Sequence, residues 1–369
     1  MRAYIFPTAR DAVARYLRGW LEGEAVRAYL VRPAPMKDDP GMTAFPVPAE
    51  WAPHRAMWVG WPSNAELWED DLEAAQAEVE GLVRALAGPG REQVRLMVGK
   101  AEALEPARTR FADVEGVTVI DGRFGDIWLR DTGPIFGQGS ARAAAFRFNG
   151  WGGKYELEHD DTVATQIGAA SGTPLDRHDF ILEGGALDHD GRGTILTTRQ
   201  CLLNPNRNPG WTEAVAEAAL DDALGATRVV WLGDGLANDH TDGHVDNLAR
   251  FVGPGVVACP VGWGADDPND EVYDATARAL TAEGLTVIRI PSPGRIENED
   301  GEPTPASHMN FLIANGAVIV PSYGNEAATE AACNALRVVL SGREIIALPS
   351  LAILTGGGSF HCISQQEPE

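Results

Sequence analysis

The last fifteen residues of the chain read Thr355-Gly-Gly-Gly-Ser-Phe-His-Cys-Ile-Ser-Gln-Gln-Glu-Pro-Glu369. Three consecutive glycines follow the apolar run Leu351–Leu354, and Cys362 comes shortly after them. Glycine has no Cβ and tolerates positive φ, so this run lets the backbone pass close to another group. A glycine-rich terminal turn with an inert buried cysteine would give the same pattern. The stretch therefore nominates Cys362 as a functional thiol only if other parts of the chain support it.

The overall composition is that of a soluble globular protein with an acidic surface. Apolar residues make up 44% of the 369 residues, and the formal net charge is -23 with a pI near 4.7. Nucleic-acid binding usually needs a basic patch, so we expect no nucleic-acid partner. An acidic field favours small cationic ligands, although it also serves simply to keep a protein soluble.

The cysteines and the apolar runs indicate the cellular compartment. The four cysteines, at positions 201, 259, 333 and 362, show no Cys-x-x-Cys and no tight spacing, so neither a zinc site nor a disulfide framework is expected. No apolar run approaches the length of a membrane span, and no signal peptide is visible. We therefore expect a cytoplasmic protein without a membrane partner.

Residues 1–41 differ from the rest of the chain. They are slightly basic, whereas residues 42–369 carry the acidic charge, and Pro33, Pro35 and Pro40 break the short helix expected before them. The stretch that starts at Met42 reads like a natural N-terminus. We interpret 1–41 as an accessory extension or a misassigned start, and 42–369 as a single catalytic domain.

From residue 42 onward, helical and β-rich stretches alternate, which predicts an α/β fold. A capping box at Ser63–Glu66 is expected to open a helix that ends at Gly88. The sequence has no Gly-x-Gly-x-x-Gly at a strand–helix junction and no P-loop, so nucleotide binding is not indicated. Strands are expected near 94–98, 117–120, 143–148, 194–198, 228–232, 255–261, 285–290, 311–321 and 344–348, and helices near 160–171, 211–224, 268–284 and 325–341.

Besides the Cys362 loop, three places concentrate polar residues at the ends of apolar runs. They are Asp126-Ile-Trp-Leu-Arg-Asp-Thr-Gly-Pro134, Phe180-Ile-Leu-Glu-Gly-Gly185 and Asn238-Asp-His-Thr-Asp-Gly-His-Val-Asp-Asn247. If extended, the first would place Trp128 and Arg130 on one face, and the third would do the same for His244 and Asp246. Each carboxylate also fits an ordinary turn or cap.

The third of these stretches also raises the question of a metal. His240 and His244 are four residues apart with Asp242 and Asp246 beside them, which suits metal ligation on a helix. Gly243 and the surrounding Asn, Asp and Thr residues disfavour a helix, and the glutamate of a His-Glu-x-x-His motif is missing. We therefore expect no metal site.

Taken together, the motifs resemble the agmatine deiminase family, within the guanidine-modifying pentein superfamily that includes arginine and peptidylarginine deiminases. The resemblance covers essentially all of 45–367. It implies a five-bladed α/β propeller of pseudo-symmetric ββαβ-type repeats around a central site. It rests on the polar stretches above, on Phe-Asn-Gly-Trp-Gly-Gly-Lys-Tyr (148–155) and on Thr-Thr-Arg-Gln-Cys-Leu-Leu-Asn-Pro-Asn-Arg-Asn-Pro (197–209).

The resemblance also implies roles for individual residues. Cys362 would be the nucleophile and His244 the general acid and base, with no cofactor required. The adjoining His361 is not chosen as the base, because neighbours on an extended strand point to opposite faces. The remaining implied contacts are Asp131 and Asp246 as guanidinium ligands, Glu183 orienting His244 and the substrate, Trp128, Gly357 and Gly358 lining the pocket, and His240 near the distal amine.

The resemblance leaves several functions open. Hydrolysis of agmatine to N-carbamoylputrescine and ammonia is the leading interpretation, on the route to putrescine. Peptidylarginine, free arginine or another guanidine are alternative substrates, and His240 suits an ammonium tail less well than an acidic residue would. An amidinotransferase, or a non-catalytic binder of cationic amines, would be further alternatives. On the resemblance alone we also expect a homo-oligomer.

Overall fold

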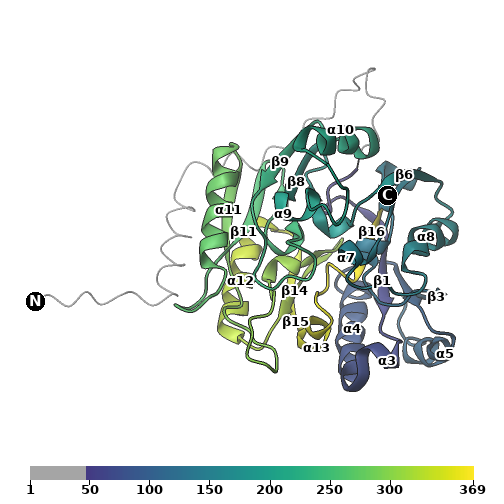
Figure 1. The fold of residues 1–369 in the computed structure, drawn as a ribbon. Coiled ribbons are helices and arrows are strands. Elements are labelled where there is room, and N and C mark those ends of the chain that lie inside the picture. The colour runs from purple at the N-terminus through teal and green to yellow at the C-terminus, as the bar shows by residue number, and fades with distance from the viewer. Residues whose placement is uncertain (1–46) are drawn as a thin grey trace, which may run out of the picture. The chain divides into compact units, whose positions relative to one another are not determined.

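Figure 1 shows the computed structural model, which describes residues 47–369. The extension proposed for residues 1–41 lies outside the described residues. Within 47–369 the strands form five small sheets, one of four strands and four of three strands. None of the helices in this part of the chain is both long and apolar enough to cross a membrane.

The four three-stranded sheets repeat one pattern. The first strand pairs antiparallel with the second, a helix follows, and the third strand pairs parallel with the second. Parallel neighbours need a crossover connection, which the helix supplies. The strands are β4 (Ile135–Phe136), β5 (Ala143–Arg147) and β6 (Leu175–Ile181); β7 (Asp188–His189), β8 (Thr194–Thr198) and β9 (Arg228–Leu232); β10 (Arg250–Gly253), β11 (Val256–Val261) and β12 (Thr286–Pro291); β13 (Leu312–Ile313), β14 (Ala317–Ser322) and β15 (Glu344–Pro349).

The four-stranded sheet repeats the same pattern with strands from both ends of the described chain. The last strand, β16 (Ser364–Pro368), pairs antiparallel with β1 (His54–Trp61), which pairs parallel with β2 (Val94–Val98). A further strand, β3 (Val117–Asp121), pairs parallel with β2. The predicted five ββαβ-type repeats are therefore confirmed, and the C-terminal strand completes the first of them.

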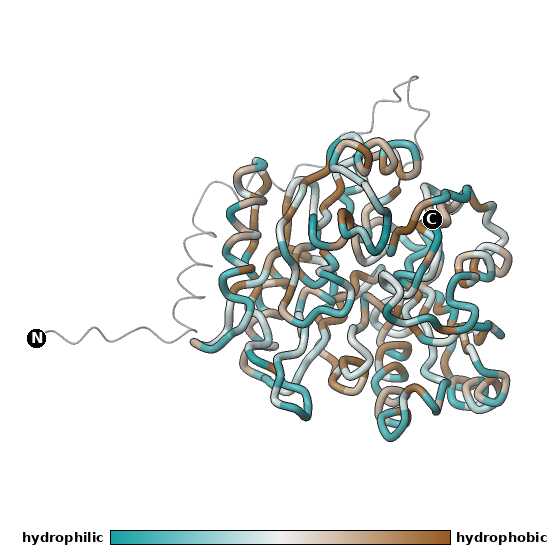
Figure 2. The backbone as a smooth tube through the Cα atoms, in the orientation of Figure 1, coloured by the Kyte–Doolittle hydropathy of each residue, from teal (hydrophilic) through white to brown (hydrophobic). Residues whose placement is uncertain are grey.

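The crossover helices bury one side each. Helix α4 (Leu72–Ala87) buries Val79, Leu82 and Val83, and helix α12 (Glu326–Val339) buries a comparable apolar stripe. In Figure 2 the tubes of these helices alternate between apolar and polar stretches. The crossover helices of the other three repeats are α8 (Val163–Ser171), α10 (Glu213–Leu224) and α11 (Asp270–Ala282), and α5 (Ala101–Arg110) is the crossover between the parallel strands β2 and β3.

Short helices and turns connect the remaining elements. The short α-helices are α3 (Ala65–Trp68), α5 (Ala101–Arg110), α6 (Leu129–Thr132), α7 (Gly150–Gly153), α9 (Arg199–Leu202) and α13 (Leu351–Thr355). The 3-10 turns are η1 (Glu69–Asp71), η2 (Gln138–Ser140), η3 (Asp160–Thr162), η4 (Gly184–Ala186), η5 (Val245–Asn247) and η6 (His308–Asn310).

Four local predictions were wrong. The end of the 238–247 stretch is the 3-10 turn η5 and not an extended segment, so the expected sharing of a strand face by His244 and Asp246 does not hold. The segment after Trp128 is the helical turn α6 and not an extended strand, so the expected sharing of a face by Trp128 and Arg130 does not hold. The helix expected from a capping box begins instead at α3, whose cap Asn64 makes no side-chain cap bond, and η1 separates α3 from α4. The strand expected over 311–321 is divided between β13 and β14.

Candidate active site

The connections between successive sheets supply the polar residues of the site. Each connection ends one repeat and begins the next, so the five of them occupy equivalent places in the fold. Two connections contain the turns α6 and η5, and a third passes through η6. In chain order the connections contribute Asp131, Glu183, then His244 with Asp246, then Asn310, and finally Cys362.

The thiol of Cys362 is buried between an amide and a carboxylate. Its Sγ lies 3.1 Å from Asn310 Nδ2 and 3.5 Å from Asp246 Oδ2. Asn310 Oδ1 also accepts hydrogen bonds from the backbone N–H groups of Cys362 and His361. Burial and then the negative charges of Asp246 and Asp131 raise the pKa of the Cys362 thiol well above its usual value. These surroundings therefore favour the thiol over the thiolate.

Two buried carboxylates, Asp246 and Asp131, flank this thiol. Asp246 Oδ2 accepts a hydrogen bond from His361 Nδ1 at 2.8 Å, whereas its Oδ1 has no protein partner. Burial would raise the pKa of Asp246, but the hydrogen bond from His361 lowers it overall. Asp131 accepts from Gly185 N and Trp151 Nε1, both at 2.9 Å. Burial raises the pKa of Asp131 to about 6, with Asp246 adding to the shift and His244 opposing it.

His244 lies between two carboxylates and has no exposed side-chain surface. Its Nδ1 is 3.7 Å from Asp131 Oδ1, and its Nε2 is 3.8 Å from Glu183 Oε2. Neither ring nitrogen has a hydrogen-bond partner. Burial would lower the pKa of His244, but the charge of Asp131 above all, followed by the contacts with Cys201 and Glu183, raises it well above the usual value. This shift favours the imidazolium form, which can donate a proton to an incoming group.

Gly185 explains why the Glu-Gly-Gly motif needs its second glycine. A Cβ at this position would lie 2.6 Å from His244 Nδ1, 2.8 Å from Asp131 Oδ1 and 3.1 Å from Asp246 Oδ2. The first two distances are too short for a real Cβ, and the third is tight. Together they show that the three side chains converge on one point.

The glycine run lies against the ring of Trp128. A Cβ on Gly358 would be 2.5 Å from Trp128 Cζ3 and 3.2 Å from Cys362 Sγ, and one on Gly356 would be 2.8 Å from Trp128 Cζ2. The indole Nε1 of Trp128 donates to the buried Asp126, which fixes the ring. Trp128 and Gly358 therefore lie beside the thiol, whereas the φ of +102° at Gly357 needs a glycine for conformational reasons.

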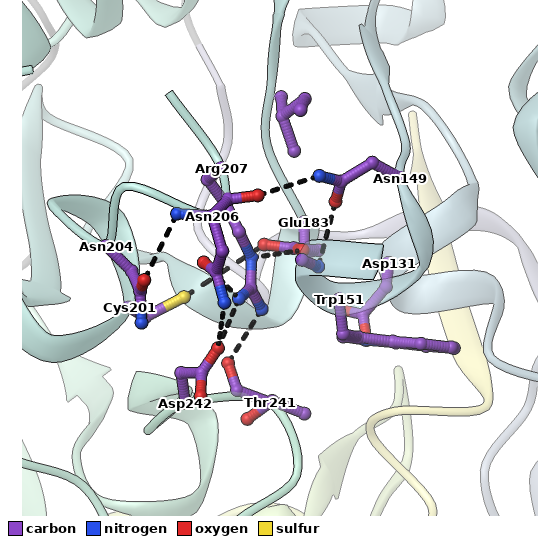
Figure 3. A network of polar contacts seen from close by, with 12 residues as sticks. Asp131, Asn149, Trp151, Glu183, Cys201, Asn204, Asn206, Arg207, Thr241 and Asp242 are labelled. Atoms are coloured by element: carbon purple, nitrogen blue, oxygen red, sulfur yellow. Dashed lines mark hydrogen bonds and ion pairs between the residues drawn. The ribbon is translucent and has the colours of Figure 1, made fainter. Parts of the chain in front are cut away.

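Glu183 is held by an arginine that the sequence had not singled out. Arg207 Nε donates to Glu183 Oε1 at 2.8 Å, and its other nitrogens bind Asp242 and the carbonyl of Thr241 (Figure 3). Burial would raise the pKa of Glu183, but the contacts with His244 and Arg207 lower it overall. Arg207 therefore joins Glu183 to the segment that leads into His244, and holds the carboxylate ionised.

His240 lies apart from this buried cluster. Its side chain is exposed, its Nδ1 lies 2.9 Å from the hydroxyl of Tyr155, and the two rings stack. A Cβ on Gly357 would be 3.8 Å from His240 Nδ1, so His240 and the glycine run lie close to one another. Its expected contact with the distal amine of a substrate stays a prediction.

The residues considered for a metal are not arranged as one ligand set. Asp242 is bound by Lys154, Asn206 and Arg207. Among the described residues, the group close enough to hold an ion is Glu183, Cys201 and His244, whose ligand atoms lie within 4.8 Å of one another. The positive charge of Arg207 on Glu183 opposes a second cation there.

The sequence matches a known protein family. The model of the Porphyromonas-type peptidyl-arginine deiminases matches residues 46–368. The chain belongs to this family.

Relatives of known name and structure agree with the family assignment. The agmatine deiminase of Stutzerimonas stutzeri is 37% identical over 364 residues, covering 89% of this chain and 97% of that protein. The solved agmatine deiminase of Enterococcus faecalis is 30% identical with a TM-score of 0.81, covering 88% and 96% of the two chains. A C. jejuni agmatine deiminase with substrate bound is 28% identical with a TM-score of 0.80, covering 87% and 95%.

Several contacts in this member of the family could not be assigned from the sequence. Trp151 and Arg207 lie in motifs on which the resemblance rests. The sequence did not show that they contact Asp131 and Glu183. Asn310 stands in an unremarkable Ser-His-Met-Asn run and gave no signal. His361 was set aside as a base because an extended strand was expected, and that reason is wrong: residues 360–363 form a turn, and the side chains of His361 and Cys362 both contact Asp246 Oδ2.

Proposed function

We propose that this protein is an agmatine deiminase, which hydrolyses agmatine to N-carbamoylputrescine and ammonia through a covalent intermediate on Cys362. The observation that carries the proposal is the arrangement around the thiol. Asp246 Oδ1 has no protein partner, while Oδ2 of the same carboxylate lies 3.5 Å from Sγ. A guanidinium bound to this carboxylate is held beside the sulfur. The family membership and the named relatives support the same reaction.

Binding overcomes the weak electrophilicity of the substrate. A guanidinium carbon reacts slowly because resonance spreads its charge over three nitrogens. Asp131 and Asp246 offer carboxylate oxygens to the Nη groups, and charge-assisted hydrogen bonds of this kind fix a planar cation in one orientation. The carbon is then presented with one face toward Sγ, so attack is effectively intramolecular.

The first half of the reaction transfers the amidine to the enzyme. The thiolate of Cys362 attacks Cζ, and a C–S bond forms to give a tetrahedral adduct. The His244 imidazolium gives its proton to one Nη, the C–N bond breaks, and ammonia leaves. A thiouronium on Cys362 and a neutral His244 remain.

The second half consumes water. Neutral His244 takes a proton from a water molecule, and the resulting hydroxide attacks the same carbon. Collapse of the second adduct breaks the C–S bond and releases the hydroxyl proton to solvent, where ammonia takes it up as ammonium. The neutral ureido product then leaves and the thiolate is restored. Glu183 stabilises the imidazolium in both halves, since its Oε2 lies beside Nε2 and Arg207 keeps the carboxylate ionised.

Ammonia release from three guanidines tests the proposal directly. Purified protein is assayed with agmatine, free arginine and a blocked arginine peptide at equal concentrations. Release with agmatine well above the other two supports the proposal. Release only with the peptide would assign peptidylarginine as the substrate and direct attention to His240. No release with any of them would contradict deiminase activity on these guanidines.

Substrate charge should also change the state of the nucleophile. Burial and the carboxylates raise the pKa of Cys362, so a bound guanidinium should lower it by cancelling their charge. Alkylation by iodoacetamide, measured against pH, should therefore reach half of its maximum at lower pH when a guanidine that the enzyme does not hydrolyse is bound. If the bound guanidine only shielded the thiol from iodoacetamide, the maximal alkylation rate would fall while the pH of the midpoint stayed the same. Identical pH midpoints with and without the guanidine would contradict the idea that the substrate helps to generate the thiolate.

Two further expectations extend the proposal. We propose a homo-oligomer and a cytoplasmic location, the first from the family resemblance and the second from the four free cysteines, which suit a reducing compartment. Sedimentation of the purified protein checks the first, and cell fractionation checks the second.

A further inference from the structure

Behind the nucleophile, buried charged groups form a chain that the reaction described above does not use. Asp246 Oδ2 is bonded to His361 Nδ1 at 2.8 Å, and His361 Nε2 lies 3.2 Å from Glu50 Oε2. Glu50 Oε2 in turn contacts Arg250, whose Nε bonds Asp188 at 2.5 Å. All five side chains are buried, with His361 only 2% exposed.

The two oxygens of Asp246 have different surroundings. Oδ2 contacts both the His361 ring and the Cys362 thiol, while Oδ1 is buried with no hydrogen-bond partner. Rotation about χ2, a torsion with broad energy wells, would turn the plane of this carboxylate and move both oxygens away from these positions. The N–H of His361 removes that freedom, because an ionised carboxylate accepts only and Nδ1 must then be the donor.

We propose that His361 is the positioning residue of the guanidinium site. Its Nδ1–H fixes the Asp246 carboxylate with one oxygen beside the thiol and the other open to substrate, and Glu50 fixes the far side of the His361 ring. This goes beyond the proposed function, in which His361 takes no proton and touches no substrate.

The remote end of the chain is itself firmly held. Glu50 Oε1 accepts from the backbone N–H of Ile313 at 2.7 Å, and Arg250 Nη1 donates to the carbonyls of Met309 and Phe311. Burial would raise the pKa of Glu50, but the charge of Arg250 and then of His361 lower it well below its usual value. An ionised Glu50 anchored to backbone is therefore a rigid partner for Nε2.

The fold should tolerate a shorter side chain at position 361. His361 lines a polar cavity together with Glu50, Arg130, His189 and Gln365. Truncation would extend this cavity, and a polar cavity of sufficient size admits water instead of leaving an empty void. Loss of function in such a variant is then separable from loss of folding.

The two amide substitutions at this position make a matched pair. The Nδ2 of an asparagine can take the place of Nδ1 and donate to Asp246. The longer glutamine reaches the place of Nε2, beside Glu50, and leaves Asp246 without its donor. His361→Asn should therefore rescue what His361→Ala loses, and His361→Gln should not.

The experiment measures agmatine dissociation constants in a Cys362→Ala background, in which no turnover occurs. His361→Ala should weaken binding by about 10-fold to 100-fold, as expected for losing one hydrogen bond to a buried charge. His361→Asn should restore most of the affinity. His54→Ala is the control, since His54 is also buried and bonded to a buried carboxylate, Glu92 at 2.9 Å, but lies outside the site.

A double-variant cycle tests the part assigned to Glu50. Glu50→Gln should weaken agmatine binding in the otherwise unchanged chain and have little effect in the His361→Asn background, where the link to Glu50 is already absent. If His361→Ala does not fold, the difference in agmatine affinity between His361→Asn and His361→Gln still tests the inference.

Three results would overturn the inference: equal losses from His361→Ala and His54→Ala, equal rescue by Asn and Gln, or the same effect of Glu50→Gln in both backgrounds. No binding of agmatine by the parent chain would instead count against the proposed function.

Discussion

Replacing Cys362 with alanine should reduce ammonia release from agmatine by at least about a thousandfold, the scale seen when a covalent nucleophile is removed. The Cys362 thiol lies beside Asp246, whereas the other thiol of the buried cluster, Cys201, lies beside Glu183 and His244. Affinity for agmatine should change little, because the carboxylates that hold the guanidinium remain. Steady-state ammonia release checks the loss of turnover, and calorimetric binding checks the unchanged affinity.

Cys333→Ala is a suitable control for this variant. Cys333 is also buried and unpaired, but it lies in α12 away from the site. It should retain the activity of the parent chain. Turnover of Cys362→Ala at a rate similar to that of Cys333→Ala would rule out covalent catalysis by Cys362.

Replacing His244 with asparagine should lower kcat for agmatine by about 10²-fold to 10⁴-fold, the usual contribution of general acid–base catalysis. Asparagine keeps a polar group in the pocket but can neither protonate the departing ammonia nor activate water. Because both halves of the reaction lose their proton donor or acceptor, the pH dependence attributable to His244 should disappear as well. Rapid-quench kinetics across a range of pH measures both effects.

His178→Asn serves as the matched control for the second prediction. His178 is partly buried in β6 and stacks on Phe146, with no contact to the site residues. Its replacement should leave kcat close to the parent value. A small effect of His244→Asn, comparable with that of His178→Asn, would assign the proton transfers to another group.

The repeating secondary structure was predictable because its strands and helices carry a clear hydrophobic period. The strands expected at 194–198 and 228–232 are β8 and β9 residue for residue. Strands of two residues, such as β4 and β7, are too short to show any period. Their existence follows from pairing with a longer neighbour.

Strand β16 escaped prediction for a different reason. Its sequence, Ser-Gln-Gln-Glu-Pro, looks like an exposed polar tail, yet all five residues are buried. Glu367 accepts from Trp58 Nε1 at 3.0 Å and pairs with Arg95 at 2.7 Å, which satisfies the buried carboxylate. Such burial depends on partners far away in the sequence, which no local pattern records.

The site residues also divide into those that a local sequence pattern marks and those that depend on distant partners. Cys362, His244, Asp131, Asp246 and Glu183 stand in recognisable motifs, and the structure brings them together. Asn310 and His361 make contacts between two connections, and Arg207 reaches Glu183 from the crossover between β8 and β9, so their partners could be found only from the fold. Sequence patterns indicated the candidate reactive side chains, and the fold shows which side chains hold them in place.

The measurement that tests the central claim most directly is mass spectrometry of the protein quenched in acid during turnover of agmatine. The account predicts an amidine adduct from agmatine without one ammonia, located on the peptide that carries Cys362, and slower formation of this adduct in His244→Asn, which cannot protonate the departing ammonia. The Cys362→Ala variant should show no adduct. An adduct on a different cysteine, or ammonia release without any adduct at either early or late quench times, would contradict the account.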